Sequence, residues 1–171
     1  MPFTPGKGHE ALRRGRLSQP HTDYFLTLCT AGRRRGLAAT EVAEAVWRVV
    51  AAMETDATWT LRCGVVMPDH LHLLVMLGER LMLSRCLQRL KAKTYAPLQA
   101  VGLGWERGYF DHRMRPDDDA APVFRYIYLN PYRAGLLSLE ERWPQYRCGA
   151  EDWAWFRGQL DRDLPVPEWL A

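Results

Sequence analysis

The stretch TWTLRCGVVMPDHLHLLVML, residues 58–77, decides how this chain folds. Residues 58–67 carry the β-branched and aromatic side chains that favour strands, and residues 70–77 form a second apolar run of strand length. Pro68 and Asp69, which separate the two runs, are typical turn residues. The stretch therefore predicts a β-hairpin.

Two histidines, His70 and His72, stand at the start of the second strand of this hairpin. Because side chains alternate along a strand, the two imidazoles share one face, and Leu71 and Leu73 share the other. Such a pair can bind one metal ion, and it can equally be structural or surface-exposed. The other histidines stand at no helpful spacing, so a third ligand would come from elsewhere, for example an oxygen donor. Imidazole together with oxygen favours magnesium or manganese.

The elements around the hairpin follow from hydrophobic periodicity and from turn residues. They are a strand at 23–30, a helix at 39–56 with Thr40 as N-cap, a helix at 81–98, a short strand at 105–114, and a helix at 120–130 that Pro131 ends or kinks. The full order is β-α-β-β-α-β-α. This order predicts an α+β, ferredoxin-like split βαβ fold with an antiparallel sheet, helices on one face and an extra C-terminal helix.

Length and composition predict one globular domain over residues 1–171, because the chain is 47% hydrophobic and 25% charged. We expect a core at about 16–146, a basic N-terminal arm at 1–20 and an acidic, Trp-rich tail at 147–171 that packs across the core. No apolar run is long enough to cross a bilayer, and the N-terminus does not resemble a signal peptide, so the expected location is the cytoplasm. Four scattered cysteines without a CxxC pair suggest neither a zinc ribbon nor a disulfide framework.

Positive charge is concentrated near the N-terminus, where residues 1–36 hold seven Lys and Arg against two acids. This excess could serve as an electrostatic footprint for nucleic acid, or it could be a solvated surface. A second basic stripe follows the helix at 81–98, where side chains four residues apart share a face. It would either contact phosphates or face solvent. The DNA-binding candidates are thus Arg13, Arg14 and Arg16 in the arm, and Arg85, Arg89, Lys91 and Lys93 on the helix.

The segment RYIYLNPYRAGLL, residues 125–137, places Tyr126 and Asn130 four residues apart on a helix, and therefore on one face. Both could be structural, with the tyrosine at the helix surface and the asparagine ending the helix before Pro131. Together with the histidine pair, Tyr126 could instead be a nucleophile and Asn130 an oxygen ligand of the metal. A phenol has a pKa of about 10, so it would need activation by a base or a nearby cation.

The order of these motifs gives a specific resemblance. The sequence MPDHLH, then a helix, then WERGYFDHRMR at 105–115 and YIYLNPYRAGL at 126–136 resembles the REP-associated tyrosine transposases of the HUH single-strand nuclease superfamily. The resemblance covers roughly residues 16–146. Two positions depart from it: Asp69 stands where the family more often has Asn, which we interpret as a conservative turn change, and Tyr132 replaces a small β-branched residue.

The resemblance implies a site and a reaction. His70 and His72 would bind a divalent metal, Mg or Mn, with Asn130 assisting at the metal. Tyr126 would attack a phosphodiester of single-stranded DNA, form a 5′-phosphotyrosine and release a 3′-hydroxyl that can later rejoin strands. The implied substrates are palindromic hairpins with a short flanking tetranucleotide, and the implied assembly is a monomer or a homodimer. The competing functions are a catalytically silent hairpin-binding protein and a hydrolase that uses a metal-bound water.

Overall fold

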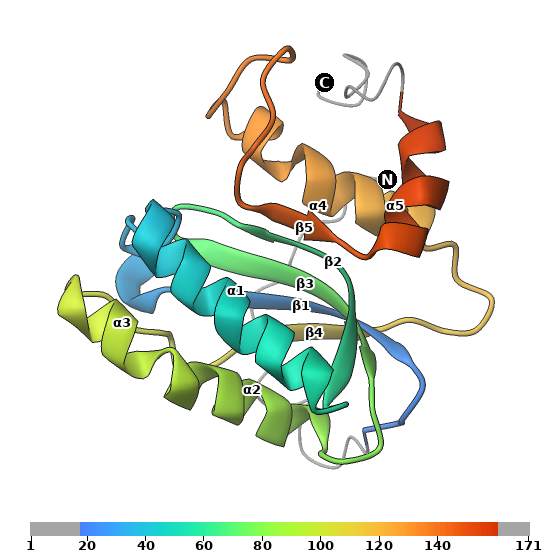
Figure 1. Cartoon of the computed structure of the whole chain (residues 1–171), viewed down its shortest axis with the longest axis horizontal. Coiled ribbons are helices and arrows are strands. Elements are labelled where there is room, and N and C mark those ends of the chain that lie inside the picture. The colour runs from blue at the N-terminus through green and yellow to red at the C-terminus, as the bar shows by residue number, and fades with distance from the viewer. Residues whose placement is uncertain (1–17, 161–171) are drawn as a thin grey trace.

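The computed structural model describes residues 18–160 of the chain. Its elements are β1 (Asp23–Cys29), the short 3-10 helix η2 (Ala31–Arg33), α1 (Thr40–Thr55), β2 (Trp59–Val66), β3 (His70–Leu77), α2 (Leu83–Lys93), α3 (Tyr95–Ala100), β4 (Phe110–Arg113), α4 (Ala121–Arg133), β5 (Tyr146–Cys148), α5 (Ala150–Phe156) and η3 (Arg157–Gln159). The strands form one antiparallel sheet in the order β4-β1-β3-β2-β5 (Figure 1). The α+β class and the antiparallel sheet are confirmed, and the hairpin of β2 and β3 lies at the centre.

Helices cover both faces of the sheet. The helices α1, α2 and α3 lie on one side, and α4 and α5 lie on the other (Figure 1). The side chains between the sheet and the helices α1, α2 and α3 form a first core, and those between the sheet and the helices α4 and α5 form a second core. Leu71 and Leu73 of β3 point into the first core, whereas Leu74 points into the second. The extra C-terminal helix expected to carry the tyrosine is α4. It shares with α5 the sheet face opposite α1 and α2 (Figure 1).

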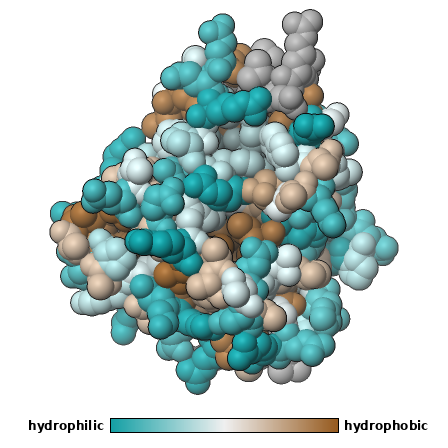
Figure 2. Space-filling view, viewed as in Figure 1, coloured by the Kyte–Doolittle hydropathy of each residue, from teal (hydrophilic) through white to brown (hydrophobic). Residues whose placement is uncertain are grey.

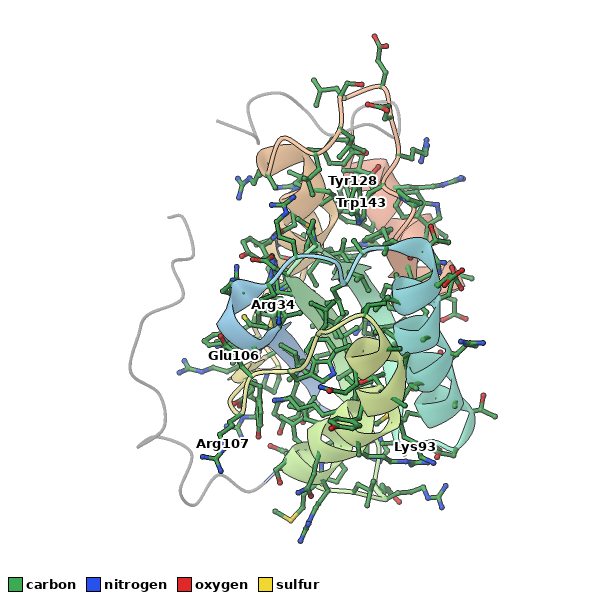
Figure 3. All side chains as sticks on the ribbon, turned by 90° about the vertical axis from the view of Figure 1, so that its left-hand side faces the viewer. Arg34, Lys93, Glu106, Arg107, Tyr128 and Trp143 are labelled. Carbon is green, nitrogen blue, oxygen red and sulfur yellow. The ribbon has the colours of Figure 1, made fainter. Side chains whose placement is uncertain are left out.

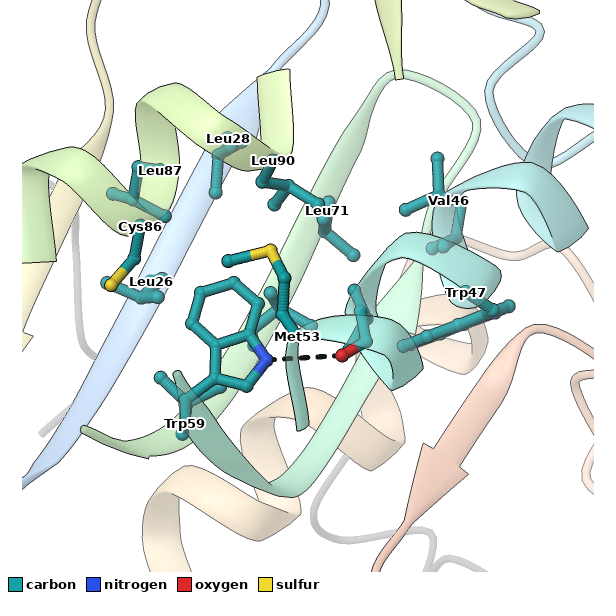
Figure 4. Close-up of a cluster of buried hydrophobic side chains, with 14 of the residues drawn as sticks. Leu26, Leu28, Val46, Trp47, Met53, Trp59, Leu71, Cys86, Leu87 and Leu90 are labelled. Carbon is teal, nitrogen blue, oxygen red and sulfur yellow. Dashed lines mark hydrogen bonds between the residues drawn. The ribbon is translucent and has the colours of Figure 1, made fainter. Parts of the chain in front are cut away.

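The first core is dense and largely apolar (Figure 4). Trp59 of β2 is almost fully buried there, and its indole N–H donates to the carbonyl of Val50 on α1 at 3.2 Å. That hydrogen bond satisfies the one polar atom of a side chain that otherwise contributes only apolar area. The outer side of these helices is mostly hydrophilic, with scattered apolar side chains (Figure 2). None of the helices in residues 18–160 is long and apolar enough to cross a membrane.

Two boundaries of the expected helices were wrong. The helix expected at 81–98 is two helices, α2 and α3, which meet at Thr94. Pro97 has no backbone N–H to donate to the carbonyl of Lys93, so one continuous helix would be broken here. Thr40 is the first residue of α1 rather than its N-cap; Ala39 takes the cap position and makes no side-chain cap hydrogen bond.

The helix α4 continues through Pro131 to Arg133, so of the two expected effects of the proline, an end or a kink, the end is wrong. Two residues beyond the helix, Gly135 has the left-handed φ of 65° that glycine adopts without a steric cost. The amide of Leu136 donates to the carbonyl of Pro131, and the amide of Gly135 donates to that of Tyr132, which is the Schellman pattern. Pro131 itself is buried, and its neighbours Leu129 and Tyr132 belong to the core on this face of the sheet, so tertiary packing holds the helix past the proline.

The described part of the C-terminal tail belongs to the fold. The strand β5, which the sequence did not predict, pairs with β2, and α5 packs against α4 through aromatic side chains. Arg62 of β2 donates to both carboxylate oxygens of Asp152 on α5 and also binds Asp23 of β1 at 2.6 Å. The hydrogen bonds with Asp152 hold the pKa of Arg62 above its usual value. Arg62 therefore ties α5 to the sheet.

Candidate active site

The two histidines of β3 lie side by side on the sheet face that α4 covers. Their ring centroids are 4.6 Å apart. In the register with β1, His70 stands opposite Cys29 and His72 opposite Thr27. Because Leu71 points into the other core, the alternation expected for this strand is confirmed.

Each imidazole is held through its Nδ1 atom by a neighbouring side chain. The Nδ1 atom of His72 lies 2.9 Å from Oγ1 of Thr27, and the Nδ1 atom of His70 lies 2.7 Å from Oδ1 of Asp69. The Nε2 atom of His72 is buried and has no hydrogen-bond partner among the described residues. A buried imidazole nitrogen without a partner lowers the stability of the fold. Such a nitrogen therefore indicates another role, such as ligation of a metal.

Burial keeps both imidazoles neutral near neutral pH. It lowers the pKa of His70, an effect that the hydrogen bond with Asp69 partly offsets. It lowers the pKa of His72 well below 6.5, and the neighbouring His70 adds to this effect. Neutral imidazole is the form that binds metal, because its lone pair is then available.

The helix α4 brings Tyr126 and Asn130 to these histidines. The ring of Tyr126 packs edge-on against that of His72, with centroids 5.2 Å apart, and against Phe25 of β1 at 5.7 Å. One turn further along α4, the side chain of Asn130 hydrogen-bonds His70, which offsets a further part of the lowering of the His70 pKa by burial. Two segments more than fifty residues apart in the sequence thus place two imidazoles, one phenol and one amide together.

The other two tyrosines of the motif lie elsewhere. Tyr128 is buried in an aromatic cluster, with its ring 5.1 Å from that of Tyr146 and 5.9 Å from that of Trp153. The Tyr132 hydroxyl donates to the carbonyl of Glu141, and burial raises its pKa. Of the three tyrosines, Tyr126 is the one in ring contact with a histidine of β3.

The donors at this site suit a divalent metal. His70, His72 and Asn130 would supply two imidazole nitrogens and one amide oxygen, a set that leaves coordination positions for substrate. Within residues 18–160, no group of three His, Cys, Asp or Glu side chains is arranged to hold a metal ion. Asn130 is of a different residue type and is placed beside His70 by α4.

The burial of His72 predicts a loss of stability in acid. The unfolded chain binds a proton at this side chain below pH 6.5, whereas the metal-free folded protein does not, so the free energy of unfolding should fall with pH below that value. The slope should reach about 1.4 kcal/mol per pH unit for this one proton, and His70 adds in the same direction. Urea denaturation between pH 5 and 8, roughly the range in which histidine titrates, measures it.

The control for this prediction is His72→Asn, whose amide can still hydrogen-bond Thr27 but does not titrate. Its slope should be smaller than that of the wild-type protein over the same pH range. Equal slopes would mean that His72 is not the proton-binding group.

The predicted DNA-binding residues that the structure describes lie apart from this site. Arg13, Arg14 and Arg16 fall outside the described residues. The remaining four belong to α2, on the opposite face of the sheet; Lys93 lies far from Tyr128 and Trp143 (Figure 3). Arg89 is paired with Asp56 and also donates to Thr58. Lys91 donates to backbone carbonyls of residues 106–108. Arg85 and Lys93 are the exposed members of the stripe.

Three side chains at the site were not singled out from the sequence. Thr27 holds His72, and Asp69, interpreted only as a turn residue, holds His70. Arg33, interpreted only as part of a basic run, binds Asp69 with Nε and Oδ2 3.0 Å apart. The position of Asp69 next to a histidine was the one available signal, because a carboxylate commonly orients a metal-binding imidazole.

Comparison with known proteins places the chain in a family. Residues 18–128 match the family described as "Transposase IS200 like". The REP-associated tyrosine transposase of Escherichia coli strain K12 is 26% identical over 125 residues, 71% of this chain and 73% of that protein. A Haemophilus influenzae relative that carries this name provisionally is 28% identical over 96 residues, 46% of this chain and 53% of the relative. The matched region spans about half of that relative's length.

A solved structure of a REP-associated tyrosine transposase bound to a REP hairpin has the same fold, with a TM-score of 0.66 and 22% identity over 77% of this chain and 79% of the other. Since the family match covers more than half of the chain, the protein belongs to the IS200-like transposases. Within that class, the resemblance to the REP-associated tyrosine transposases that the motifs indicated is confirmed.

Proposed function

We propose that this protein is a metal-dependent transposase and endonuclease that cleaves and rejoins hairpin-containing single-stranded DNA through a 5′-phosphotyrosine at Tyr126. The observation that carries the proposal is the position of α4, which holds the Tyr126 ring 5.2 Å from that of His72 while Asn130 hydrogen-bonds His70. Tyrosine and histidines so placed could act on the same phosphate.

The residues would divide the chemistry between them. The Tyr126 oxygen attacks phosphorus and forms a new P–O bond, while the bond from phosphorus to the 3′ oxygen breaks. The phenolic proton is released, and the departing 3′ oxygen takes up a proton to become a hydroxyl. His70, His72 and Asn130 would hold Mg²⁺ or Mn²⁺, which would supply charge neutralisation at the phosphate. Attack by another 3′-hydroxyl reverses the step, so the covalent link conserves the bond energy.

The proposed partner is a single strand that folds into palindromic hairpins. The REP-associated tyrosine transposase of known structure is bound to a REP hairpin, and the formal charge of +3 on this chain agrees with a polyanionic partner. The proposal involves no membrane and leaves both a monomer and a homodimer open. The alternative is a catalytically silent protein that binds hairpins without cutting them.

A denaturing gel with labelled hairpin DNA and Mn²⁺ separates these functions. A covalent protein–DNA adduct together with a released 3′-hydroxyl fragment is the expected result. Cleavage without an adduct would indicate a hydrolase that uses a metal-bound water. A shift on a native gel with neither adduct nor cleavage would indicate the silent binder.

Hairpin affinity should fall steeply with salt, because Lys and Arg side chains that meet phosphates release counterions on binding. If the exposed Lys93 is one of them, Lys93→Gln should lower affinity for all sequences alike and reduce the slope of log K against log salt by about one. Fluorescence anisotropy at several salt concentrations measures both values. An unchanged slope in this variant would contradict a phosphate contact by Lys93 of the α2 stripe.

A further inference from the structure

Arg33, Asp69 and His70 form a continuous chain of polar contacts that leads from the surface to the candidate metal site. Nε of Arg33 forms an ion pair with Oδ2 of Asp69 at 3.0 Å, and Oδ1 of Asp69 lies 2.7 Å from Nδ1 of His70. Each carboxylate oxygen therefore serves a different nitrogen. The Asp69 side chain is about one-quarter exposed and that of His70 is 12% exposed, so water competes little for the contact between them, whereas the Arg33 side chain is about half exposed.

The backbone around this chain is fixed. Thr30 is fully buried, its amide donates to the carbonyl of Asp69 at 3.0 Å, and its hydroxyl lies 2.7 Å from the carbonyl of Arg34 and 3.0 Å from that of Asp69. Arg33 has a left-handed φ of 55°, a conformation that arginine adopts only when its surroundings hold it. Nη1 of Arg33 also lies 2.8 Å from the sulfur of Cys29, on the strand opposite His70. The neighbouring Arg34 marks this turn in Figure 3.

We propose that Asp69 is a positioning residue for the metal site, and that Arg33 makes a carboxylate, rather than an amide, necessary at this position. Asp69 holds the proton of His70 on Nδ1 and so keeps the lone pair on Nε2, the nitrogen left to bind the metal. This inference rests on the proposed function, since it assumes that His70 is a metal ligand.

The requirement for a carboxylate follows from the count of donors and acceptors. Arg33 can only donate, and His70 must donate from Nδ1 if Nε2 is to bind metal. A carboxylate presents an oxygen to each of them, but a side-chain amide has one accepting oxygen and one donating NH₂ group. With Asp69→Asn, the amide must either turn its NH₂ group toward Arg33 or turn it toward His70, where it favours the wrong tautomer.

Titration of the full-length, metal-free protein with MnCl₂ by calorimetry tests this pairing. Asp69→Asn should raise the Kd for Mn²⁺ by about 10- to 100-fold, the usual effect of losing the partner of a metal-binding histidine. Adding Arg33→Ala to this variant should restore most of the affinity, because the amide oxygen can then turn to His70. Arg48→Ala, which removes an exposed arginine of α1, is the charge-matched control and should leave the Kd unchanged.

A wild-type affinity in Asp69→Asn would overturn the inference, as would a double variant no better than Asp69→Asn alone. Circular dichroism and thermal melting confirm that each variant is folded. If the wild-type protein and His70→Ala bind Mn²⁺ equally, the metal site of the proposed function fails.

A second measurement needs no metal. Histidine side-chain ¹⁵N NMR of the metal-free protein at pH 8, about 1.5 units above the ordinary histidine pKa, reports which nitrogen of His70 carries the proton. We expect Nδ1–H in the wild-type protein, and a shift toward Nε2–H in Asp69→Asn that the added Arg33→Ala reverses. Nε2–H in the wild-type protein would overturn the inference whether or not the protein binds Mn²⁺. Nδ1–H in a protein that binds no Mn²⁺ would support the positioning role of Asp69 and contradict the metal site alone.

Discussion

Tyr126→Phe should form no covalent adduct with hairpin DNA and should cut nothing, while remaining folded. The substitution keeps the ring that packs against Phe25 and His72 and removes only the oxygen that would attack phosphorus. Removing the nucleophile costs about 10⁶-fold in rate in a well-studied protease, so cleavage should fall below detection. The measurement is a denaturing gel with labelled single-stranded substrate and Mn²⁺, followed by peptide mapping of the adduct of the wild-type protein.

The two matched controls are Tyr128→Phe and Tyr132→Phe, which remove the same atom from buried tyrosines of the same helix. Both should keep most of the activity, since their rings pack against each other and the Tyr128 ring packs against Tyr146 and Trp153. Tyr132→Phe should cost some stability, because it leaves the Glu141 carbonyl without its donor. A phosphotyrosine mapped to Tyr128 or Tyr132 would refute the assignment of Tyr126.

His70→Ala should abolish cleavage and leave hairpin binding largely intact. The imidazole would serve the metal, whereas phosphate contacts that determine affinity come from Arg and Lys elsewhere. Replacing a residue that orients a metal ligand already lowers metal affinity or activity by about 10- to 100-fold. Loss of the ligand itself should therefore reduce the cleavage rate by more than about 100-fold. Cleavage kinetics over a range of MnCl₂ concentrations and anisotropy with the same hairpin give the two values separately.

The control here is His21→Ala, which removes an exposed histidine that is paired with Glu79 at the surface. It should bind and cut like the wild-type protein. Cleavage by His70→Ala at the wild-type rate would contradict the assignment of this histidine as a metal ligand. Equal loss of binding and cleavage would mean that His70 contacts DNA directly.

Much of the fold could be predicted because its central elements have clear periodicity. The strands β2 and β3 have long β-favouring runs around a Pro-Asp turn, and α1 repeats apolar residues at helical spacing. The strand β5 could not be predicted, because its three residues are too few to show alternation and pair only because β2 offers an edge. Likewise, nothing local indicates that Pro131 lies inside a helix; burial of the proline and core packing of its neighbours Leu129 and Tyr132 override the local preference.

The candidate site was predictable to the extent that its residues follow a strand or a helix. Alternation put His70 beside His72, and the helical repeat put Tyr126 on the side of Asn130. That these two pairs meet depends on which face of the sheet α4 covers, which no spacing reveals. The residues behind the histidines were missed for the same reason: Thr27 reaches His72 across strands, and Arg33 reaches Asp69 through a loop.

The way α4 is held has a consequence for kinetics. The ring of Tyr128 lies against Tyr146 of β5 and Trp153 of α5, and β5 pairs with β2 of the same chain. Exchange of α4 between two copies of the chain would require β5 to leave the sheet and the aromatic cluster to open. A site that uses the phenol and the imidazoles of one molecule would cut strands at a rate first order in protein, whereas exchange of α4 would make the rate depend on dimer formation. In the first case few copies per cell would suffice, since the frequency of cutting would scale with copy number; in the second it would scale with the square of the copy number.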